Sequence, residues 1–358
     1  MSTETLEWLN TNTLIGCADQ RGEAWHTRKG HDNHYPAGIP VEDVRRRLFN
    51  FTVESYPVCF MAPCALDHPE LAGINADGNP FRLIVSQQGR QGQVRSDNGF
   101  DLGVFSDGYQ GHDYSEWLIE NVEAMLGQGL VIGSAGLLKA GAVAWVQVEM
   151  PDTVHTPSGE ELRPFLLAVT SFDGSVATRY KRGVTRVVCD NTLSLGLSED
   201  GFAWSARHTR NSMFRIDAAR VALDVLATHT IEQATNDYVT EAERLINTAV
   251  SDTEWSKLVY EITVPRDAKG KPITDDVSSS TATRMANKQA ALNRMWETNP
   301  MVSMWKGTAW GALQAVSTFD LHESSVRGKA RAERNMLAAV TGSLVDADVL
   351  RRLALVTA

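Results

Sequence analysis

The hydrophobic pattern changes its period near residue 212, and this change limits the possible folds more than any other feature. Before it, short alternating segments such as 81–86 and 100–106 are separated by Gly, Asp and Asn, as is typical of antiparallel strands. After it, apolar residues recur at helical spacing, most clearly over 231–249. The sequence therefore predicts an α+β fold: an antiparallel strand-rich N-terminal core with a packed helix, followed by a helical C-terminal region.

This pattern divides the chain into three expected regions. Residues 1–80, rich in Gly, Pro, His and Asn, are predicted to be an irregular N-terminal region, 81–211 an α+β core, and 212–358 the helical region. Within the core, 115–126 has the 3-4 apolar spacing of a helix. The polar, proline-containing segment 264–280 is a possible linker. Further strands are expected at 93–95, 165–170, 177–180 and 185–189, and a hairpin over 130–150. A helix is expected at 41–51, where Pro40 precedes acidic residues in the first turn, and further helices near 282–296, 303–319 and 326–358.

Composition limits the class of protein. The 358 residues carry a formal net charge of -10, with 43% hydrophobic and 22% charged residues, which argues against global disorder and against a protein that is basic all over. Residues 1–10 have neither a basic nor an apolar signal region, and no apolar run approaches the ~18 residues of a membrane span. We therefore expect a cytoplasmic protein without a membrane partner. The four cysteines are expected to be free thiols.

The glycine-rich segment 133–139 resembles a phosphate-binding loop only superficially. A Walker A loop needs four residues between its glycines and ends in Gly-Lys-Ser/Thr, whereas Lys139 is followed by Ala140. Strand-bend glycines are the better interpretation of Gly133 and Gly136. No dinucleotide-binding or nucleophile-elbow motif occurs, so no cofactor is expected.

Three histidines form the densest group of candidate metal ligands. His26, His31 and His34 surround Asp32, and imidazole with carboxylate suits zinc or manganese. No second group of ligands with recognisable spacing follows them. Surface histidines in a polar loop are the alternative interpretation.

Positive charge is concentrated in one part of this acidic chain. Residues 174–220 contain eight basic and four acidic residues, a net charge of +4, which leaves -14 for the rest. Seven of the eight cations are Arg, whose planar guanidinium suits phosphate recognition. Interleaved aromatic residues are candidates for stacking on bases: Tyr180, Phe202, Trp204 and Phe214. An ordinary basic face, paired with the protein's own acids, fits the pattern equally well.

Several strings together resemble the phage/plasmid-like proteins of domain-of-unknown-function family 932. They are GEAWH (22–26), the block 133–145, DG (173–174), VVCDNTL (187–193) and RHT (207–209). The resemblance implies a setting in phage and plasmid genomes, among genes of DNA replication and recombination. It implies no established activity and no residue roles.

A second resemblance is architectural. A strand–strand–helix core with an Arg-rich segment is similar in outline to single-strand annealing proteins of the RecT and Red-beta type, which bind single-stranded DNA and assemble into rings or filaments. We therefore expect a DNA-binding homo-oligomer that promotes strand annealing, without a catalytic residue. The residues expected to track the phosphates are Arg179, Lys181, Arg182 and Arg186. Arg207, His208 and Arg210 are expected to line the same groove.

Other interpretations remain open. Asn191 either contacts sugar or base edges or stabilises a turn. The chain is alternatively a metal-dependent, nuclease-like enzyme that uses His26, His31 and His34. A third possibility is a non-catalytic phage protein that binds a host protein through its helical half.

Overall fold

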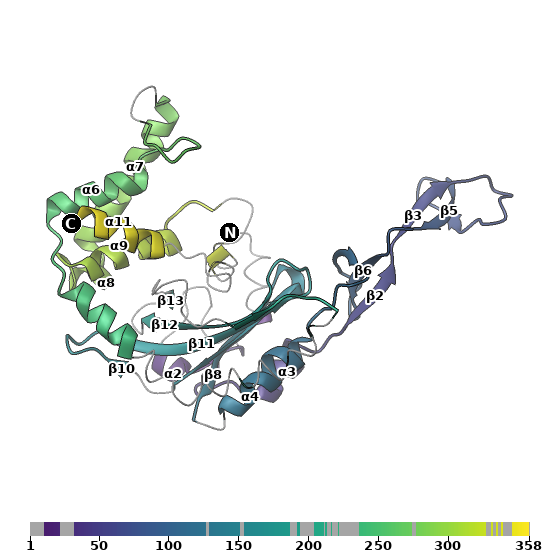
Figure 1. Ribbon diagram of the computed structural model, residues 1–358, viewed down its shortest axis with the longest axis horizontal. Coiled ribbons are helices and arrows are strands. Elements are labelled where there is room, and N and C mark those ends of the chain that lie inside the picture. The colour runs from purple at the N-terminus through teal and green to yellow at the C-terminus, as the bar shows by residue number, and fades with distance from the viewer. Residues whose placement is uncertain are drawn as a thin grey trace.

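The structure is a computed structural model in which antiparallel sheets occupy the first half of the chain and helices the second, confirming the predicted α+β class (Figure 1). No helix within the described residues is long and apolar enough to cross a bilayer. The described residues are 11–21, 32–126, 129–150, 154–186, 192–193, 204–210, 212, 216, 221, 236–273, 277–326, 331, 334–335, 338 and 346–357.

A central eight-stranded antiparallel sheet forms the body of the first half. Its strand order is β1-β8-β9-β11-β12-β13, with β10 beside β11 and β14 beside β12. The predicted hairpin is formed by β8 and β9, whereas β12 is one continuous strand where the sequence predicts two. The bounds are β1 Thr13–Ile15, β8 Val131–Leu138, β9 Val143–Glu149, β10 Val154–His155, β11 Glu161–Ser171, β12 Thr178–Arg186, β13 Thr192–Leu193 and β14 Trp204–Ala206.

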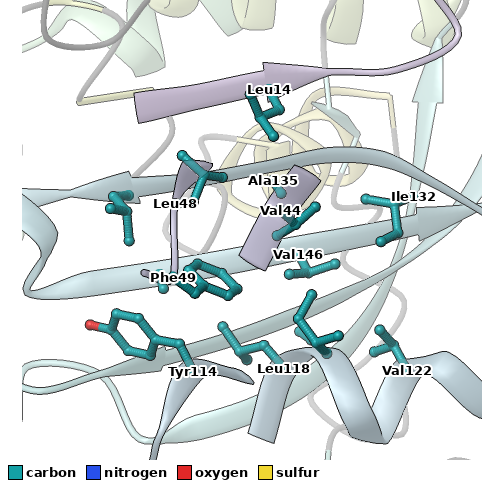
Figure 2. Packing of buried hydrophobic residues seen from close by; sticks show 14 of the residues in the cluster. Leu14, Val44, Leu48, Phe49, Tyr114, Leu118, Val122, Ile132, Ala135 and Val146 are labelled. Atoms are coloured by element: carbon teal, nitrogen blue, oxygen red, sulfur yellow. The ribbon is translucent and has the colours of Figure 1, made fainter. Parts of the chain in front are cut away.

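Helices cover one face of this sheet. The predicted helix 115–126 is present as a π-helical turn, η1 (Ser115–Glu120), that continues into α4 (Asn121–Leu126). Leu118 and Val122 are fully buried against the sheet, as their spacing predicts. A second helix, α3 (Val41–Arg47), packs into the same core, which Figure 2 shows between the two helices and the strands.

Two glycines of β8 make room for large side chains of β9. A Cβ on Gly136 would lie 2.1 Å from the ring of Trp145, and one on Gly133 would lie 2.1 Å from the carboxyl carbon of Glu149. The strand pairing also shifts register between Ile132 and Ser134. These glycines therefore make room for Trp145 and Glu149 across the strand pair, a packing role that the interpretation as strand-bend glycines did not include.

The helical half has its own core. Residues 236–246 are helical, and the rings of Trp255 and Trp296 stack 4.6 Å apart at its centre. The helix that carries Trp255 is not among those expected, although Ser251 and Glu254 form a capping box at its start. The bounds are α6 Asp252–Thr263, α7 Ser279–Thr298, α8 Pro300–Ser303, α9 Ala309–His322 and α11 Asp346–Val356.

The two halves are in direct contact. Leu162 of β11 belongs to the core of the helical half. The indole nitrogen of Trp305 donates a hydrogen bond to Glu160 at 2.7 Å, and Ser158 donates its backbone N–H and its hydroxyl to Glu243. The helical half is thus anchored at the β10–β11 end of the sheet.

A long β-arm projects away from the sheet (Figure 1). It contains two three-stranded sheets, β2-β6-β7 next to the body and β3-β5-β4 at the tip. The expected strands at 81–86, 93–95 and 100–106 are therefore present, but they lie in the arm. The bounds are β2 Val53–Pro57, β3 Cys59–Pro63, β4 Gly73–Ile74, β5 Pro80–Val85, β6 Arg90–Arg95 and β7 Asp101–Ser106.

Two parts of the expected division can be described more closely. The N-terminal region 1–80 contains α3, within the helix expected at 41–51, and the strands β2 to β4, which pair with β6 and β5, strands that follow them in the sequence. The segment 264–280 joins α6 to α7 by a loop closed by a bridge between Arg266 and Pro272. Its last residues, from Ser279, belong to α7.

Candidate nucleic-acid interface

The predicted basic residues lie on β12 and directly after β14. The first half of β12 pairs with β14, with Thr178 opposite Ala206 and Arg179 opposite Ser205. Its second half pairs with β13. The backbone places Arg182 opposite Leu166 and Arg186 opposite Leu162. The side chains of Arg182 and Arg186, and all of Asn191, lie outside the described residues.

Strand alternation places Arg179 and Lys181 on the sheet face opposite α3 and α4. Tyr180, between them, is fully buried in the core that those helices form. Successive side chains of a strand point to opposite faces, so Arg179 and Lys181 both point away from that core. Arg179 is exposed, and Lys181 is half-buried. Arg207, which follows Ser205 by two residues, is exposed as well.

Three cations lie on or beside this face, and two of them, Arg179 and Arg207, are exposed. Burial lowers the pKa of Lys181, and the neighbouring charge of Arg179 lowers it further. Neither Arg179 nor Arg207 forms an ion pair with a described carboxylate. An anion placed here would relieve the repulsion between Arg179 and Lys181. We call Arg179, Lys181 and Arg207 the cationic face.

Arg210 is in a different situation. A guanidinium nitrogen of Arg210 lies 3.8 Å from a carboxylate oxygen of Asp107, with 73% and 65% of the two side chains exposed. A surface ion pair of this kind contributes little to stability and is screened by salt. Arg210 thus lies beside an acid at the base of the arm.

His208 belongs to a hydrogen-bonded cluster. Its Nδ1 lies 3.1 Å from the hydroxyl of Tyr109, and its Nε2 lies 3.2 Å from the hydroxyl of Thr170. Burial lowers the pKa of His208 to about 4, although the charge of Asp173 opposes that shift. The imidazole is therefore neutral at pH 7, and it can meet a phosphate only as a hydrogen-bonding group.

A second histidine completes this cluster, and sequence reasoning did not find it. His112 is fully buried, stacks on Trp117 at 3.8 Å and contacts His208 at 4.4 Å between ring centroids. Its Nδ1 hydrogen-bonds to Thr178, and its Nε2 to the hydroxyl of Ser212 at 2.7 Å. Burial, with a smaller effect of His208, lowers the pKa of His112 to about 3.

We call the two histidines and their hydroxyl partners the imidazole cluster: His112, His208, Tyr109, Thr170, Thr178 and Ser212. Within it, the contact between Ser212 and His112 resembles that of a catalytic nucleophile and its general base only in outline. Ser212 is fully buried, so its oxygen cannot reach a substrate, and the group that orients His112 is the hydroxyl of Thr178 in place of a carboxylate. The cluster joins the base of the arm, β11, β12 and the residues after β14. It therefore holds the segment carrying Arg207 against the sheet.

Tyr180 does not have the role that the sequence interpretation gives it. It is fully buried, and its hydroxyl bonds to the carbonyl of Trp117 and to Asn121. Stacking of Tyr180 on a base is therefore excluded. Trp204 is half-buried beside Tyr180, with 5.6 Å between ring centroids. Phe202 and Phe214 lie outside the described residues.

The candidate metal ligands are only partly described. His26 and His31 lie outside the described residues. His34 hydrogen-bonds through Nδ1 to Asn33, whose amide donates to the carbonyl of Thr13. Where the structure describes the chain, it brings no three potential ligand residues together.

Comparison with known proteins gives one match. No curated protein and no solved structure matches the chain. A family model described as "Domain of unknown function (DUF932)" matches residues 101–341. The matched part runs from β7 through strands β8 to β14 of the central sheet and most of the helical half, and so covers about two thirds of the sequence. The chain therefore belongs to the DUF932 family.

Proposed function

We propose that the chain binds single-stranded DNA on the cationic face and promotes annealing of complementary strands. The observation that carries this proposal is the placement of two cations, exposed Arg179 and half-buried Lys181, on one sheet face; burial first, and the charge of Arg179 second, lower the pKa of Lys181. A polyanion is the ligand that such a face favours. The phage and plasmid setting implied by the resemblance makes DNA the preferred polyanion.

The burial of Tyr180 supports an annealing role. Proteins that bind single-stranded DNA tightly stack its bases on aromatic side chains. Tyr180 is fully buried, so it cannot stack on a base at the cationic face. Binding through phosphates leaves base edges free to pair with a second strand. Affinity is then insensitive to base sequence and strongly dependent on salt.

Fluorescence anisotropy with a labelled oligothymidylate across a salt series tests the proposal. We expect binding without added metal, and we expect Arg179→Glu and Arg207→Glu each to weaken it. Each lost phosphate contact lowers the slope of log affinity against log salt by about 0.7. Arg46→Glu is the matched control, because Arg46 is 71% exposed on α3, which covers the opposite face of the sheet.

Two results would overturn the proposal. One is absence of binding at low salt. The other is equal weakening by Arg46→Glu and Arg179→Glu, which would mean that bulk charge is responsible. Strand annealing is followed with two complementary labelled oligonucleotides, and cleavage of either strand on addition of manganese would favour the nuclease-like alternative.

A further inference from the structure

A chain of hydrogen bonds starts at the base of the arm and runs through the imidazole cluster. Its members, in order, are the carbonyl of Phe172 and the side chains of Tyr109, His208, Thr170, Thr178, His112 and Ser212. The six contacts are between 2.5 and 3.2 Å long. Burial lowers the pKa of His112 to about 3 and that of His208 to about 4, so both imidazoles are neutral at pH 7. Each of the six side chains therefore brings one proton to the chain.

The carbonyl at the arm end fixes the direction of the first protons. The carbonyl oxygen of Phe172 can only accept, so the hydroxyl of Tyr109 donates to it at 2.7 Å. That hydroxyl has no second proton, so it accepts from Nδ1–H of His208 at 3.1 Å. Nε2 of His208 is then an acceptor, and the hydroxyl of Thr170 at 3.2 Å donates to it.

The same rule fixes the inner half of the chain. The hydroxyls of Thr170 and Thr178 lie 2.6 Å apart, and both are within 3.4 Å of Nε2 of His208, so their two protons are used between these three groups. Nδ1 of His112 must therefore supply the proton of its contact with Thr178, and Nε2 accepts from Ser212 at 2.7 Å. Both histidines are thus assigned the Nδ1–H tautomer. We call this fixed set of donors the proton order.

Tyr109, which sets the proton order, is joined to the arm. It lies three residues beyond the end of β7, and its backbone N–H donates to the carbonyl of Ser106. Its ring stacks on Phe105 of β7, with 4.0 Å between ring centroids and an angle of 13°. A change in the direction of the arm therefore moves the hydroxyl on which the proton order depends.

The chain also holds the segment that carries Arg207. The pairing of β14 with β12 ends at Ala206, and the described backbone hydrogen bonds of 207–212 are local. The side chains of His208 and Ser212 attach this segment to the sheet and to the residues before η1. Because Arg207 directly precedes His208, a fixed imidazole limits the positions that the guanidinium can take.

We propose that Tyr109 is a positioning residue for the cationic face: it fixes His208 and thereby Arg207, so that the arm regulates DNA binding. The inference rests on the proposed function, whereas the proton order is measured without DNA. An Arg207 that is already ordered loses less side-chain freedom when it binds a phosphate than one on a loosened segment. Loss of the Tyr109 hydroxyl should therefore weaken DNA binding, although this hydroxyl carries no charge.

Two-bond proton–nitrogen NMR correlation of the histidine rings tests the proton order. The rings of His112 and His208, assigned with His112→Gln and His208→Gln variants, should both carry their proton on Nδ1. In Tyr109→Phe five protons serve four contacts, so both directions become possible and the ring nitrogen shifts of His112 should change. Ser212→Ala leaves the carbonyl end intact, so His208 should keep its tautomer.

Fluorescence anisotropy with labelled oligothymidylate tests the effect on DNA. Tyr109→Phe should lower the affinity about 2- to 10-fold, which corresponds to ordering one side chain on binding. It should lower the slope of log affinity against log salt by about 0.7, as loss of one phosphate contact does. Arg207→Ala should add little in the Tyr109→Phe background, whereas Arg179→Ala should keep its full effect there. Tyr56→Phe is the control, because it removes a hydroxyl from β2 of the same arm.

Three outcomes would overturn the inference. They are a proton on Nε2 of either histidine in the wild-type protein, unchanged His112 signals in Tyr109→Phe, and equal DNA affinity of Tyr109→Phe and Tyr56→Phe. Absence of DNA binding by the wild-type protein would overturn the proposed function and with it the regulatory role of Tyr109, even where NMR confirms the proton order. The two failures are therefore distinguishable.

Discussion

The hydroxyl of Tyr109 lies 3.1 Å from Nδ1 of His208, and it donates a hydrogen bond to the carbonyl of Phe172 at 2.7 Å. Because this hydroxyl has one proton, it accepts from Nδ1–H of His208, which leaves Nε2 as the acceptor facing Thr170. The base of the arm is thereby tied to the segment that follows β14. Removal of the Tyr109 hydroxyl should therefore loosen both the base of the arm and the segment that follows β14.

Tyr109→Phe should lower the free energy of unfolding by about 1 to 2 kcal/mol, because it leaves a buried carbonyl and a buried imidazole nitrogen without their partner. Urea unfolding measures the change as a lower midpoint at unchanged slope. Tyr56→Phe is the control, since the exposed Tyr56 hydroxyl donates a hydrogen bond to Glu54 at the surface of the arm. Equal effects of the two substitutions would contradict the assigned network.

The two histidines should make the protein sensitive to acid. Their folded pKa values, about 3 for His112 and about 4 for His208, lie below the unfolded value of about 6.5. Between these values the unfolded chain binds more protons, so the stabilisation is complete above about pH 6.5 and is lost as the pH falls toward 4 and then 3.

Proton NMR checks the cause directly. The ring signals of His112 and His208, assigned with a His208→Gln variant, should not shift between pH 8 and about pH 5.5, while an added reference imidazole does. Urea unfolding at the same two pH values should show lower stability at the lower one. A midpoint of either ring near 6.5 would contradict the buried, neutral state.

The buried ion pair between Arg163 and Glu149 should show a large interaction free energy in a double-mutant cycle. Nη1 of Arg163 lies 3.7 Å from Oε1 of Glu149, and both side chains are at most 2% exposed. Arg163→Met should cost about 3 to 5 kcal/mol, because it leaves the carboxylate buried without its cation. Glu149→Gln with Arg163→Met should cost less than Arg163→Met alone. A fully additive double-mutant cycle would show that the two groups do not interact.

Gly136→Ala should destabilise the sheet. The new methyl group would meet the ring of Trp145, which is fully buried, so overpacking should cost at least about 1 to 3 kcal/mol. Gly92→Ala on β6 is the control, because a Cβ there meets only the carbonyl of Tyr56 at 3.9 Å. Denaturant unfolding of both variants checks this, and a neutral Gly136→Ala would mean that β9 has room to move.

The local hydrophobic pattern of the sequence was sufficient to predict many of the helices and strands. The spacing of Trp117, Leu118 and Val122 predicts a helix, and all three side chains are buried on it. The alternation over 81–86 and 100–106 predicts strands, and β5 and β7 follow those bounds to within a residue. Helix α6 was missed, yet the pair Ser251 and Glu254 was a readable signal for its start.

The arm could not be recognised in the same way. Phe60 and Ile84 alternate as core residues do, because a strand has the same pattern whether a second layer covers it or not. Whether such residues are buried depends on a second layer that packs against the strand, and Phe60 and Ile84 remain 59% and 41% exposed in the folded chain. The imidazole cluster was equally hidden, since His112, Thr178 and His208 are far apart in the sequence.

By itself, the sequence determined the α+β class, most strands and helices, and the concentration of positive charge between 174 and 220, because these depend on local periodicity and composition. Only the tertiary structure decided which residues share a surface. The alternation of β12 separates Tyr180 from Arg179, and the pairing of β14 places Arg207 near Arg179. It also decided that His208 is neutral, because a pKa depends on burial and neighbours that exist only once the chain has folded.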